Sequence, residues 1–244
     1  MTTEFPLVTD KYTLINDDSL IYLEKFEDNS IENFITGIPD MNEVNMDLDN
    51  YINFFYKSAR LIFKKLSKTG YAIFVQTDRK INGTWLSKFN LLTNISKEFN
   101  LNLMWHKIVL QRDVGSIHLQ RPTFSNIMCY SFTNKPGKCF NDVFHIGNKL
   151  YENATPENVA EKLVIFLKEQ GQKSVFDPFV GMGTVGKFAV IHDLQFLGID
   201  ISKSQCILAN NLISNFINND IKEESKTITK TITKTKLKLK KNNI

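Results

Sequence analysis

A glycine-rich stretch after a short apolar run carries the most specific chemistry in this sequence. In SVFDPFVGMGTVGKFAV, Ser174 to Val190, a predicted strand ends at Asp177 and a helix is predicted to begin near Thr184. The glycines between and after these points are Gly181, Gly183 and Gly186. Such a turn lets the backbone approach a ligand closely, with the amides of the helix N-terminus facing it. A second predicted strand, FLGID, ends at Asp200, whose carboxylate suits a ribose diol. We therefore expect a ligand that bears a ribose.

Two phosphate-binding patterns overlap these glycines. The glycines satisfy the G-x-G-x-x-G pattern of dinucleotide-binding proteins, and residues 181–187 satisfy all but the last position of G-x-x-x-x-G-K-[ST]. The second pattern lacks the hydroxyl that would hold magnesium, because Phe188 stands there. The first pattern opens a nicotinamide-binding fold, whereas here only one further strand follows it. The remaining strands must lie upstream, so the order of the sheet looks permuted.

A second polar corner lies in ENFITGIPDMNE, Glu32 to Glu43. A predicted strand runs directly into Gly37-Ile38-Pro39-Asp40, and Glu43 offers a second carboxylate near Asp40. A carboxylate at such a corner could serve as a general base. A Pro-Asp turn that caps the following helix would account for the same residues without any chemistry.

The elements that position both corners follow from the apolar runs and their punctuation. Strands are predicted at Tyr12–Ile15, Asn33–Thr36, Tyr71–Val75, Leu101–Leu110, Ser125–Phe132, Ser174–Phe176 and Phe196–Ile199. Helices are predicted at Ser19–Phe26, Asp47–Leu66, Trp85–Phe99, Thr155–Glu169, Val185–His192 and Ser202–Asn218. This alternation predicts an α/β fold with a Rossmann-like, doubly wound, mostly parallel sheet, whose ligands bind at the carboxyl ends of its strands. Two late strands on either side of TNKPGK are expected to form an antiparallel edge.

These motifs together resemble the permuted, beta-type amino-methyltransferases that modify DNA or RNA bases with S-adenosylmethionine. DPFVGMGTVG followed by FLGIDISKSQCILA resembles the cofactor-binding end of that family, which closes the chain. The opening LINDDSLIYLEKFEDNSIENFITGIPD is similar to the family's N-terminal part. MWHKIVLQ and ATPENVAEKLVIFL resemble the strand and the helix that lie between the two ends. The resemblance spans Leu14 to about Leu208 and implies a circularly permuted methyltransferase order with S-adenosyl-L-methionine as cofactor.

The resemblance also implies a role for each matching residue. Asp200 would bind the ribose and Asp18 the adenine amino group. The methionine part would be held by Asp177, Pro178, Phe179, Gly181, Gly183 and Thr184. Each role has a structural alternative, since Asp18 and Asp200 could cap the helices that follow them and Phe179 could belong to the core.

The target side departs from the family's Asp-Pro-Pro-Tyr motif. Gly37 stands in place of the acceptor side chain and Asp40 in place of the stacking aromatic, while Pro39 is retained. The candidate catalytic residues are therefore Asp40, Pro39 and Gly37. In one interpretation Asp40 acts on a different atom of the target; in the other, catalysis is lost and the chain is a methyltransferase-like subunit that binds nucleic acid or a protein partner. We expect a methyltransferase acting on a DNA or RNA base, with the inactive subunit as the alternative.

Other residues near these corners have weaker signals. Arg121 could reach a phosphate or pair with Asp40 across the cleft. His118 is expected in a surface loop, Trp105 in the core, and Phe124 in the core rather than against a base. Almost all of the sequence between the two motif sets is taken up by the sheet, so a partner, a structured RNA or the tail is expected to help choose the target.

Composition divides the chain into residues 1–220, one methyltransferase-like domain, and residues 221–244, a basic low-complexity tail that is expected to be disordered. The tail holds eight Lys and two Glu, so the net charge of +4 leaves −2 for residues 1–220. A lysine tail can neutralise phosphates, although a solubilising tail would look the same.

Cys129, Cys139 and Cys206 form no CxxC pair, so no metal is expected. The absence of a long apolar run or a leader pattern favours an intracellular, soluble protein without membrane contact.

Overall fold

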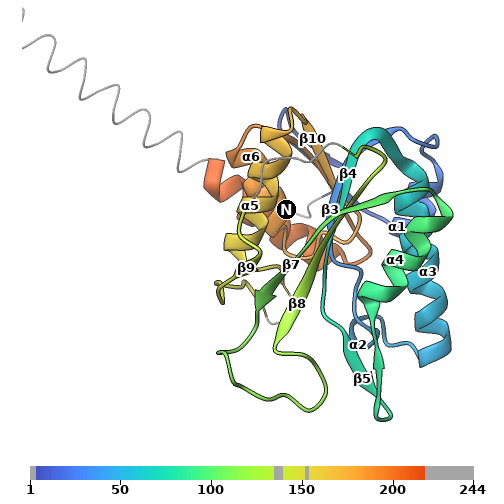
Figure 1. The fold of residues 1–244 in the computed structure, drawn as a ribbon. Coiled ribbons are helices and arrows are strands. Elements are labelled where there is room, and N and C mark those ends of the chain that lie inside the picture. The colour runs from blue at the N-terminus through green and yellow to red at the C-terminus, as the bar shows by residue number, and fades with distance from the viewer. Residues whose placement is uncertain (1–3, 135–139, 152–153, 218–244) are drawn as a thin grey trace, which may run out of the picture.

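The computed structural model describes residues 4–134, 140–151 and 154–217. These residues form a sheet of nine strands in the order β1-β2-β11-β10-β3-β4-β8-β7-β9, together with a separate hairpin, β5-β6 (Figure 1). The sheet strands are β1 Leu7–Val8, β2 Tyr12–Asn16, β3 Ile31–Thr36, β4 Leu66–Gln76, β7 Asn102–Leu110, β8 Phe124–Ser131, β9 Val143–Phe144, β10 Ser174–Asp177 and β11 Gln195–Asp200. The hairpin strands are β5 Arg79–Ile81 and β6 Thr84–Leu86. The helices are α1 Ser19–Glu24, α2 Met41–Val44, α3 Leu48–Lys65, α4 Lys88–Glu98, α5 Glu157–Glu169 and α6 Thr184–Ile191, and residues 203–217 are also helical.

The centre of the sheet is parallel, and this confirms the predicted fold class. Strands β2, β11, β10, β3 and β4 run in the same direction, while β8 pairs antiparallel with both β4 and β7. The antiparallel edge exists, but its position differs from the prediction. The strands on either side of TNKPGK are β8 and β9, which do not pair with each other; β9 instead pairs in parallel with β7. The reason is that both edges of β8 are already paired, one with β4 and the other with β7. The free edge for β9 is therefore that of β7.

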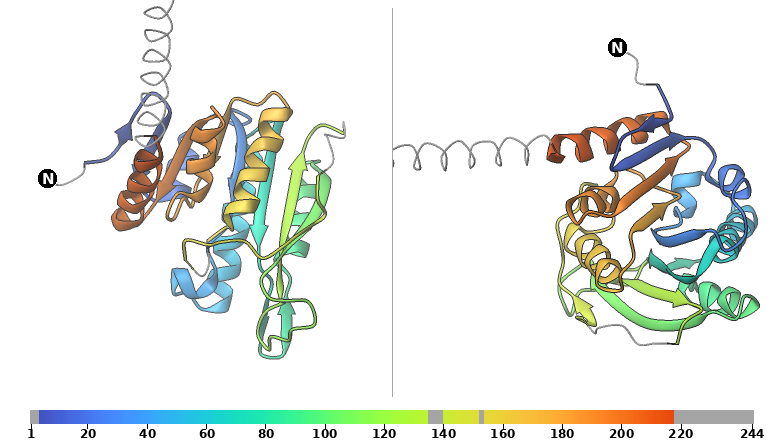
Figure 2. Two further views of the ribbon diagram at one scale, coloured as in Figure 1. Left: turned by 90° about the vertical axis from the view of Figure 1, so that its left-hand side faces the viewer. Right: turned by 90° about the horizontal axis from the view of Figure 1, so that it is seen from above.

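Helices cover both faces of the sheet, as Figure 2 shows. Helices α5 and α6 pack on one face in a core that includes Leu163, Val164 and Val185. Helices α1, α3 and α4 pack on the other face, in a core that includes Phe55 and Ile62. The side chains of β3 alternate between the two cores, since Ile35 belongs to the first and Phe34 to the second. The described part of the chain is therefore a three-layer α/β unit.

The order of the strands is permuted as expected. The last two strands, β10 and β11, lie between β2 and β3, which come early in the chain. In the parallel register, Phe176 of β10 pairs with Phe34 of β3, and Asp200 of β11 pairs with Asn16 of β2. The carboxyl ends of β2, β3, β10 and β11 therefore meet at one end of the sheet, and this brings the glycine-rich stretch and the Gly-Ile-Pro-Asp corner together.

The structure adds the short elements β1, α2, β5, β6 and β9, none of which matches a predicted range, and one predicted helix is shorter than expected. The helix predicted at Trp85–Phe99 begins only at Lys88, because residues 84–86 form β6 and Ser87 caps α4 with its hydroxyl. Cys129 and Cys206 are buried and free, whereas Cys139 and the tail, residues 221–244, lie outside the described residues. No helix in the described ranges combines the length and apolar composition needed to cross a membrane.

Candidate active site

The glycine-rich turn between β10 and α6 has the backbone that its sequence predicts. Gly181 and Gly183 have φ of 52° and 83°, in the left-handed region that side chains disfavour. A Cβ on Gly183 would also lie 2.9 Å from Cβ of Ala209. The carboxylate of Asp200 accepts hydrogen bonds from the amide of Gly181 at 3.0 Å and from the amide of Ser202 at 2.8 Å. The turn therefore lies directly against the acidic end of β11, with its conformation held by that carboxylate.

Asp177 lies buried beneath this turn. Its Oδ1 accepts hydrogen bonds from the hydroxyl of Thr36 at 2.7 Å and from the amide of Phe179 at 3.1 Å. Burial raises the pKa of Asp177 to about 7, although both hydrogen bonds act in the opposite direction. Because Thr36 precedes Gly37, this carboxyl links the glycine-rich turn to the Gly-Ile-Pro-Asp corner.

Asp18 and Ser19 stand at the end of β2, beside β11. Oδ1 of Asp18 accepts hydrogen bonds from the amides of Leu20 and Ile21 and so caps α1. The hydroxyl of Ser19 donates to the carbonyl of Pro178. The Asp-Ser pair thus fixes the start of α1 against the turn after β10, in addition to any role toward a ligand.

The structure removes the triphosphate interpretation of residues 181–187. The ammonium of Lys187 bonds Glu157 of α5 at 2.7 Å, and lies over the ring of Phe188. A lysine that binds phosphates would instead face the glycine turn. Lys187 therefore joins α6 to α5.

The Gly-Ile-Pro-Asp corner is held from behind by the end of β4. A Cβ on Gly37 would lie 3.0 Å from the carbonyl oxygen of Val75, so the corner can approach β4 this closely because position 37 has no side chain. The buried Gln76 donates from Nε2 to the carbonyl of Ile38 at 3.2 Å. The carbonyl of Ile38 at this corner thus already has one hydrogen-bond donor.

Asp40 is at once a helix cap and the centre of an ion network. It begins α2 in a capping box with Glu43, whose side chain accepts from the amide of Asp40 at 2.7 Å. Its Oδ1 lies 3.1 Å from the ammonium of Lys88, and its Oδ2 lies 3.0 Å from the guanidinium of Arg79. Burial alone would raise the pKa of Asp40, but Lys88, the amide of Met41 and Arg79 together hold it below its usual value.

Lys88 is the buried member of this network. Its side chain is only 2% exposed, and burial lowers the pKa of its ammonium despite the neighbouring Asp40. Arg121, which the sequence offered as a partner of Asp40, forms no ion pair with it; Arg79 and Lys88 take that place. They do so because β5 and the start of α4 lie directly beside α2.

One cleft of about 670 Å³ brings the two corners together. Six of the candidate site residues line it: Gly37, Pro39, Asp40, Phe179, Gly181 and Asp200. Five others are not among the lining residues: Asp18, Asp177, Pro178, Gly183 and Thr184. Asp177 and Thr184 are buried and Asp18 caps α1. The glycine-rich turn and the target-side corner are therefore two walls of the same space.

Tyr151 is a cleft residue that the sequence did not single out. Its hydroxyl would lie 2.8 Å from a Cβ on Gly181, so the absence of a side chain at Gly181 makes room for it. Burial raises the pKa of Tyr151 to about 12, and the nearby carboxyl groups of Glu43, Asp177 and Asp200 act in the same direction. Tyr151 therefore stands between the cofactor-side and target-side walls. No pattern in the sequence marks it, since it follows β9 in an irregular segment.

The weaker candidates have mostly structural roles. Nδ1 of His118 accepts from the amides of Gln120 and Arg121, and so shapes its own loop. Trp105 packs edge-on against Phe140 and Phe166, as expected for a core residue. His118 and Arg121 both line the cleft.

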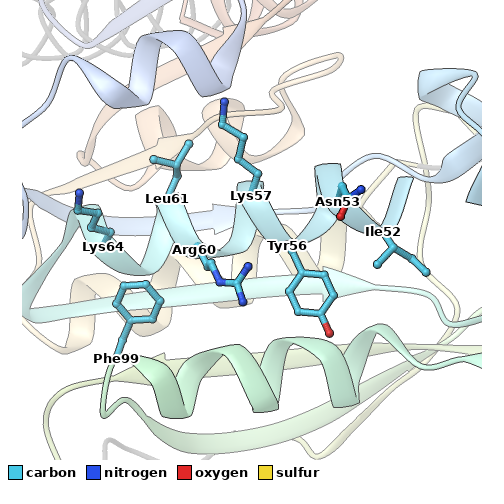
Figure 3. Close-up of a pocket in the computed structure, with 8 residues that line it drawn as sticks. All are labelled: Ile52, Asn53, Tyr56, Lys57, Arg60, Leu61, Lys64 and Phe99. Atoms are coloured by element: carbon cyan, nitrogen blue, oxygen red, sulfur yellow. The ribbon is translucent and has the colours of Figure 1, made fainter. Parts of the chain in front are cut away.

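A second hollow of about 550 Å³ lies along α3 beside Phe99 (Figure 3). It is lined by three cations, but each has an acidic partner: Lys57 pairs with Glu24, Arg60 with Glu98 and Lys64 with Asp28. The described residues that line it include no carboxylate, histidine or cysteine. The first cleft is therefore the candidate active site.

Comparison with known proteins shows a resemblance, over part of the chain, to the family that the motifs indicate. Residues 118–211 match the family model N6_N4_Mtase, described as DNA methylase. The orphan methyltransferase M.BamHII of Bacillus amyloliquefaciens is 40% identical over 55 residues, which are 22% of this chain and 20% of that protein. The match thus spans about a fifth of the length of this curated relative.

Solved structures of low sequence identity share the fold over most of the chain. The cytosine-N4-specific PvuII DNA methyltransferase has a TM-score of 0.69 at 17% identity, over 86% of this chain and 92% of that one. A protein of Thermus thermophilus described as a DNA modification methylase, in complex with S-adenosyl-L-methionine, has a TM-score of 0.64 at 16% identity, over 85% of this chain and 96% of that one. The predicted resemblance to N4/N6 methylases and the predicted fold are both confirmed.

Proposed function

We propose that this chain, which is related to the N6/N4 DNA methylases through residues 118–211 and through its fold, is an S-adenosylmethionine-dependent methyltransferase acting on a base of a nucleic acid. One observation carries the proposal. The glycine-rich turn with Asp200 and the Gly-Ile-Pro-Asp corner line a single cleft of about 670 Å³, so a cofactor on one wall and a base on the other would share one space. Positioning of this kind supplies much of the rate enhancement in a transfer between two bound molecules.

The cofactor-side wall suits S-adenosylmethionine. When bound, this cofactor supplies an electrophilic methyl group on a positively charged sulfur. We assign Asp200 to the ribose, since its carboxylate stands at the carboxyl end of β11 beside the left-handed turn. The methionine part is assigned to the turn after β10, and Asp18 to the adenine amino group. The residues of that turn are Asp177, Pro178, Phe179, Gly181, Gly183 and Thr184. The carboxyl group of Asp200, which lines the cleft, also suits a cationic ligand.

The target-side wall favours a hydrogen-bonding role for Asp40. Its Oδ1 already accepts from Met41 and Lys88, whereas Oδ2 accepts only from Arg79 among the described residues. Oδ2 is therefore the oxygen proposed to accept a hydrogen bond from the target base. Two cations hold the pKa of Asp40 low, so it orients the target and stabilises positive charge on it rather than removing a proton outright. Gly37 and Pro39 form the part of the cleft wall next to Asp40.

The test is transfer of a labelled methyl group. Purified protein is incubated with tritium-labelled S-adenosylmethionine and with DNA or RNA from cells that lack the gene. We expect acid-insoluble label that either DNase or RNase removes, which identifies the class of nucleic acid. Calorimetry on the same sample measures cofactor binding. Cofactor binding without any label would contradict methyl transfer and would leave a binding subunit as the function.

A further inference from the structure

The loop between β7 and β8, residues 111–123, carries three strongly exposed apolar side chains. Val114, Ile117 and Leu119 are 88%, 83% and 82% exposed. The loop lies beside the β5-β6 hairpin, residues 79–86, at the end of the molecule where α2 begins (Figures 1 and 2). Trp85 on that hairpin is 51% exposed. We call these two segments the loop–hairpin surface. Large apolar side chains exposed on two neighbouring segments suggest a site of interaction.

This surface is held in place by backbone hydrogen bonds. The amide of Lys80 donates to the carbonyl of Gln120 at 2.8 Å and joins the hairpin to the loop. The amide of Gln111 donates to the carbonyl of Thr123 at 2.7 Å and closes the base of the loop. His118 accepts from two amides within it. The exposed side chains are thus carried by a defined turn that connects directly to the cleft.

The charges around the loop favour a polyanion over a protein as its partner. Arg112 and Arg121 both line the cleft, and neither forms a salt bridge with any acid in the described ranges. The cations along α3, in contrast, are each paired with a carboxylate. The loop contains a single acid, Asp113, and the hairpin contains none. Two unpaired guanidinium groups at the mouth of the cleft suit phosphates.

We propose that the loop–hairpin surface binds duplex nucleic acid and that Ile117 and Leu119 enter the base stack where a base has been extruded into the cleft. The inference rests on the proposed function. A base whose reacting edge is inside a duplex must leave the stack before a methyl group can reach it. Apolar side chains inserted between base steps offset the lost stacking. This loop borders the cleft and carries such side chains next to two arginines, so it is placed to support an extruded base from outside the cleft.

The experiment compares binding to intact and interrupted duplexes. Fluorescence anisotropy gives the dissociation constant for a fluorescein-labelled 30-base-pair pool of mixed sequence, for the same pool with a central abasic site, and for single strands. We expect wild-type protein to prefer the abasic duplex, since the vacancy admits the side chains without unstacking. Ile117→Ser/Leu119→Ser should lower this preference at least fivefold and should change single-strand affinity less than twofold. Val8→Ser, at an exposed apolar position on β1 far along the sheet, is the matched control and should behave as wild type.

The arginines give an independent readout. Arg112→Gln/Arg121→Gln should weaken intact, abasic and single-stranded binding by similar factors and reduce the slope of log affinity against log salt by about 2. Arg60→Gln, which removes a guanidinium already paired with Glu98, should leave that slope unchanged.

The outcomes separate this inference from methyl transfer. An equal abasic preference in wild type and in the serine variant, or no duplex binding by wild type, would overturn the inference even if label is transferred; the apolar loop would then face a protein. A variant-sensitive preference without any label transfer would leave the inference standing and overturn methyl transfer.

Discussion

At the scale of single residues, Asp40 combines two roles that can be separated. Asp40→Asn keeps an oxygen for the α2 cap but leaves the buried ammonium of Lys88 without its counter-charge. Breaking a buried pair by removing one partner costs about 3 kcal/mol, so we expect the free energy of unfolding in urea to fall by that amount. Methyl transfer should be lost, while the dissociation constant of the cofactor stays unchanged.

The double variant Asp40→Asn/Lys88→Met provides the control. Removing the ammonium as well should restore most of the stability, because no uncompensated charge remains in the interior. If Asp40 takes part in the transfer, this stable variant stays inactive. Recovery of transfer in it would show that the carboxylate acts only through the folding of the corner.

Asp177 should make stability depend on pH. Its pKa is raised to about 7 by burial, and such a carboxyl favours folding most when protonated. Its contribution is therefore fully present below about pH 4 and is lost as the pH rises to about 7. Asp177→Asn can still accept from Thr36 and should remove this dependence. Urea unfolding at several pH values tests this: a variant whose stability falls over that range as steeply as the wild type would contradict it.

The sequence was informative about the residues of the turn and much less so about their partners. Gly181, Gly183 and Asp200 could be found because local backbone geometry demands those residue types at short spacing. The ion pair of Asp40 with Lys88 joins positions 48 residues apart, at the starts of α2 and α4, and no local pattern reports such a long-range contact. Tyr151 was missed because it lies in an irregular segment after β9, which no local pattern marks.

At the scale of elements, the close packing of the turn that begins α6 can be tested by comparing Gly183 with Gly171, a glycine after α5 that also has a left-handed backbone. Gly171 has φ of 78° with no atom within 4 Å of a Cβ, whereas Gly183 has φ of 83° with Ala209 at 2.9 Å. Gly171→Ala should cost about 1 kcal/mol for its left-handed backbone alone. Gly183→Ala should cost about 1–3 kcal/mol more, from overpacking, and should weaken cofactor binding. Equal losses of stability in urea would contradict the close packing of α6 and residues 203–217.

The long elements were predictable because each has a sustained apolar period. Helix α3 and strands β3, β10 and β11 agree with the predicted ranges to within a few residues. The hairpin β5-β6 was not predicted, and the end of β6 was assigned to a predicted helix, because each strand has three residues, too few to establish an alternation. Short projecting elements are therefore the ones that the sequence conceals, and here they include the loop–hairpin surface.

At the scale of the whole molecule, charge is concentrated in residues 221–244, with net +6. Deleting these residues should flatten the salt dependence of nucleic-acid binding, because fewer counterions are released when fewer lysines contact phosphate. Anisotropy titrations of one duplex at several salt concentrations measure the slope. An unchanged slope would mean that the tail makes no phosphate contact. Replacing the tail lysines with glutamine at constant length separates charge from length.

The position of β10 and β11 in the sheet also governs how the chain can be made. A ribosome releases β2 and β3 early, but the two strands that belong between them emerge only with residues 174–200. Until then both β2 and β3 lack their neighbours, and their unpaired edges could join other chains. The parallel core can close only after residues 174–200 have emerged, which makes folding slow and dependent on contacts distant in sequence. A chain interrupted before residue 174 would be an aggregation-prone product rather than a smaller domain.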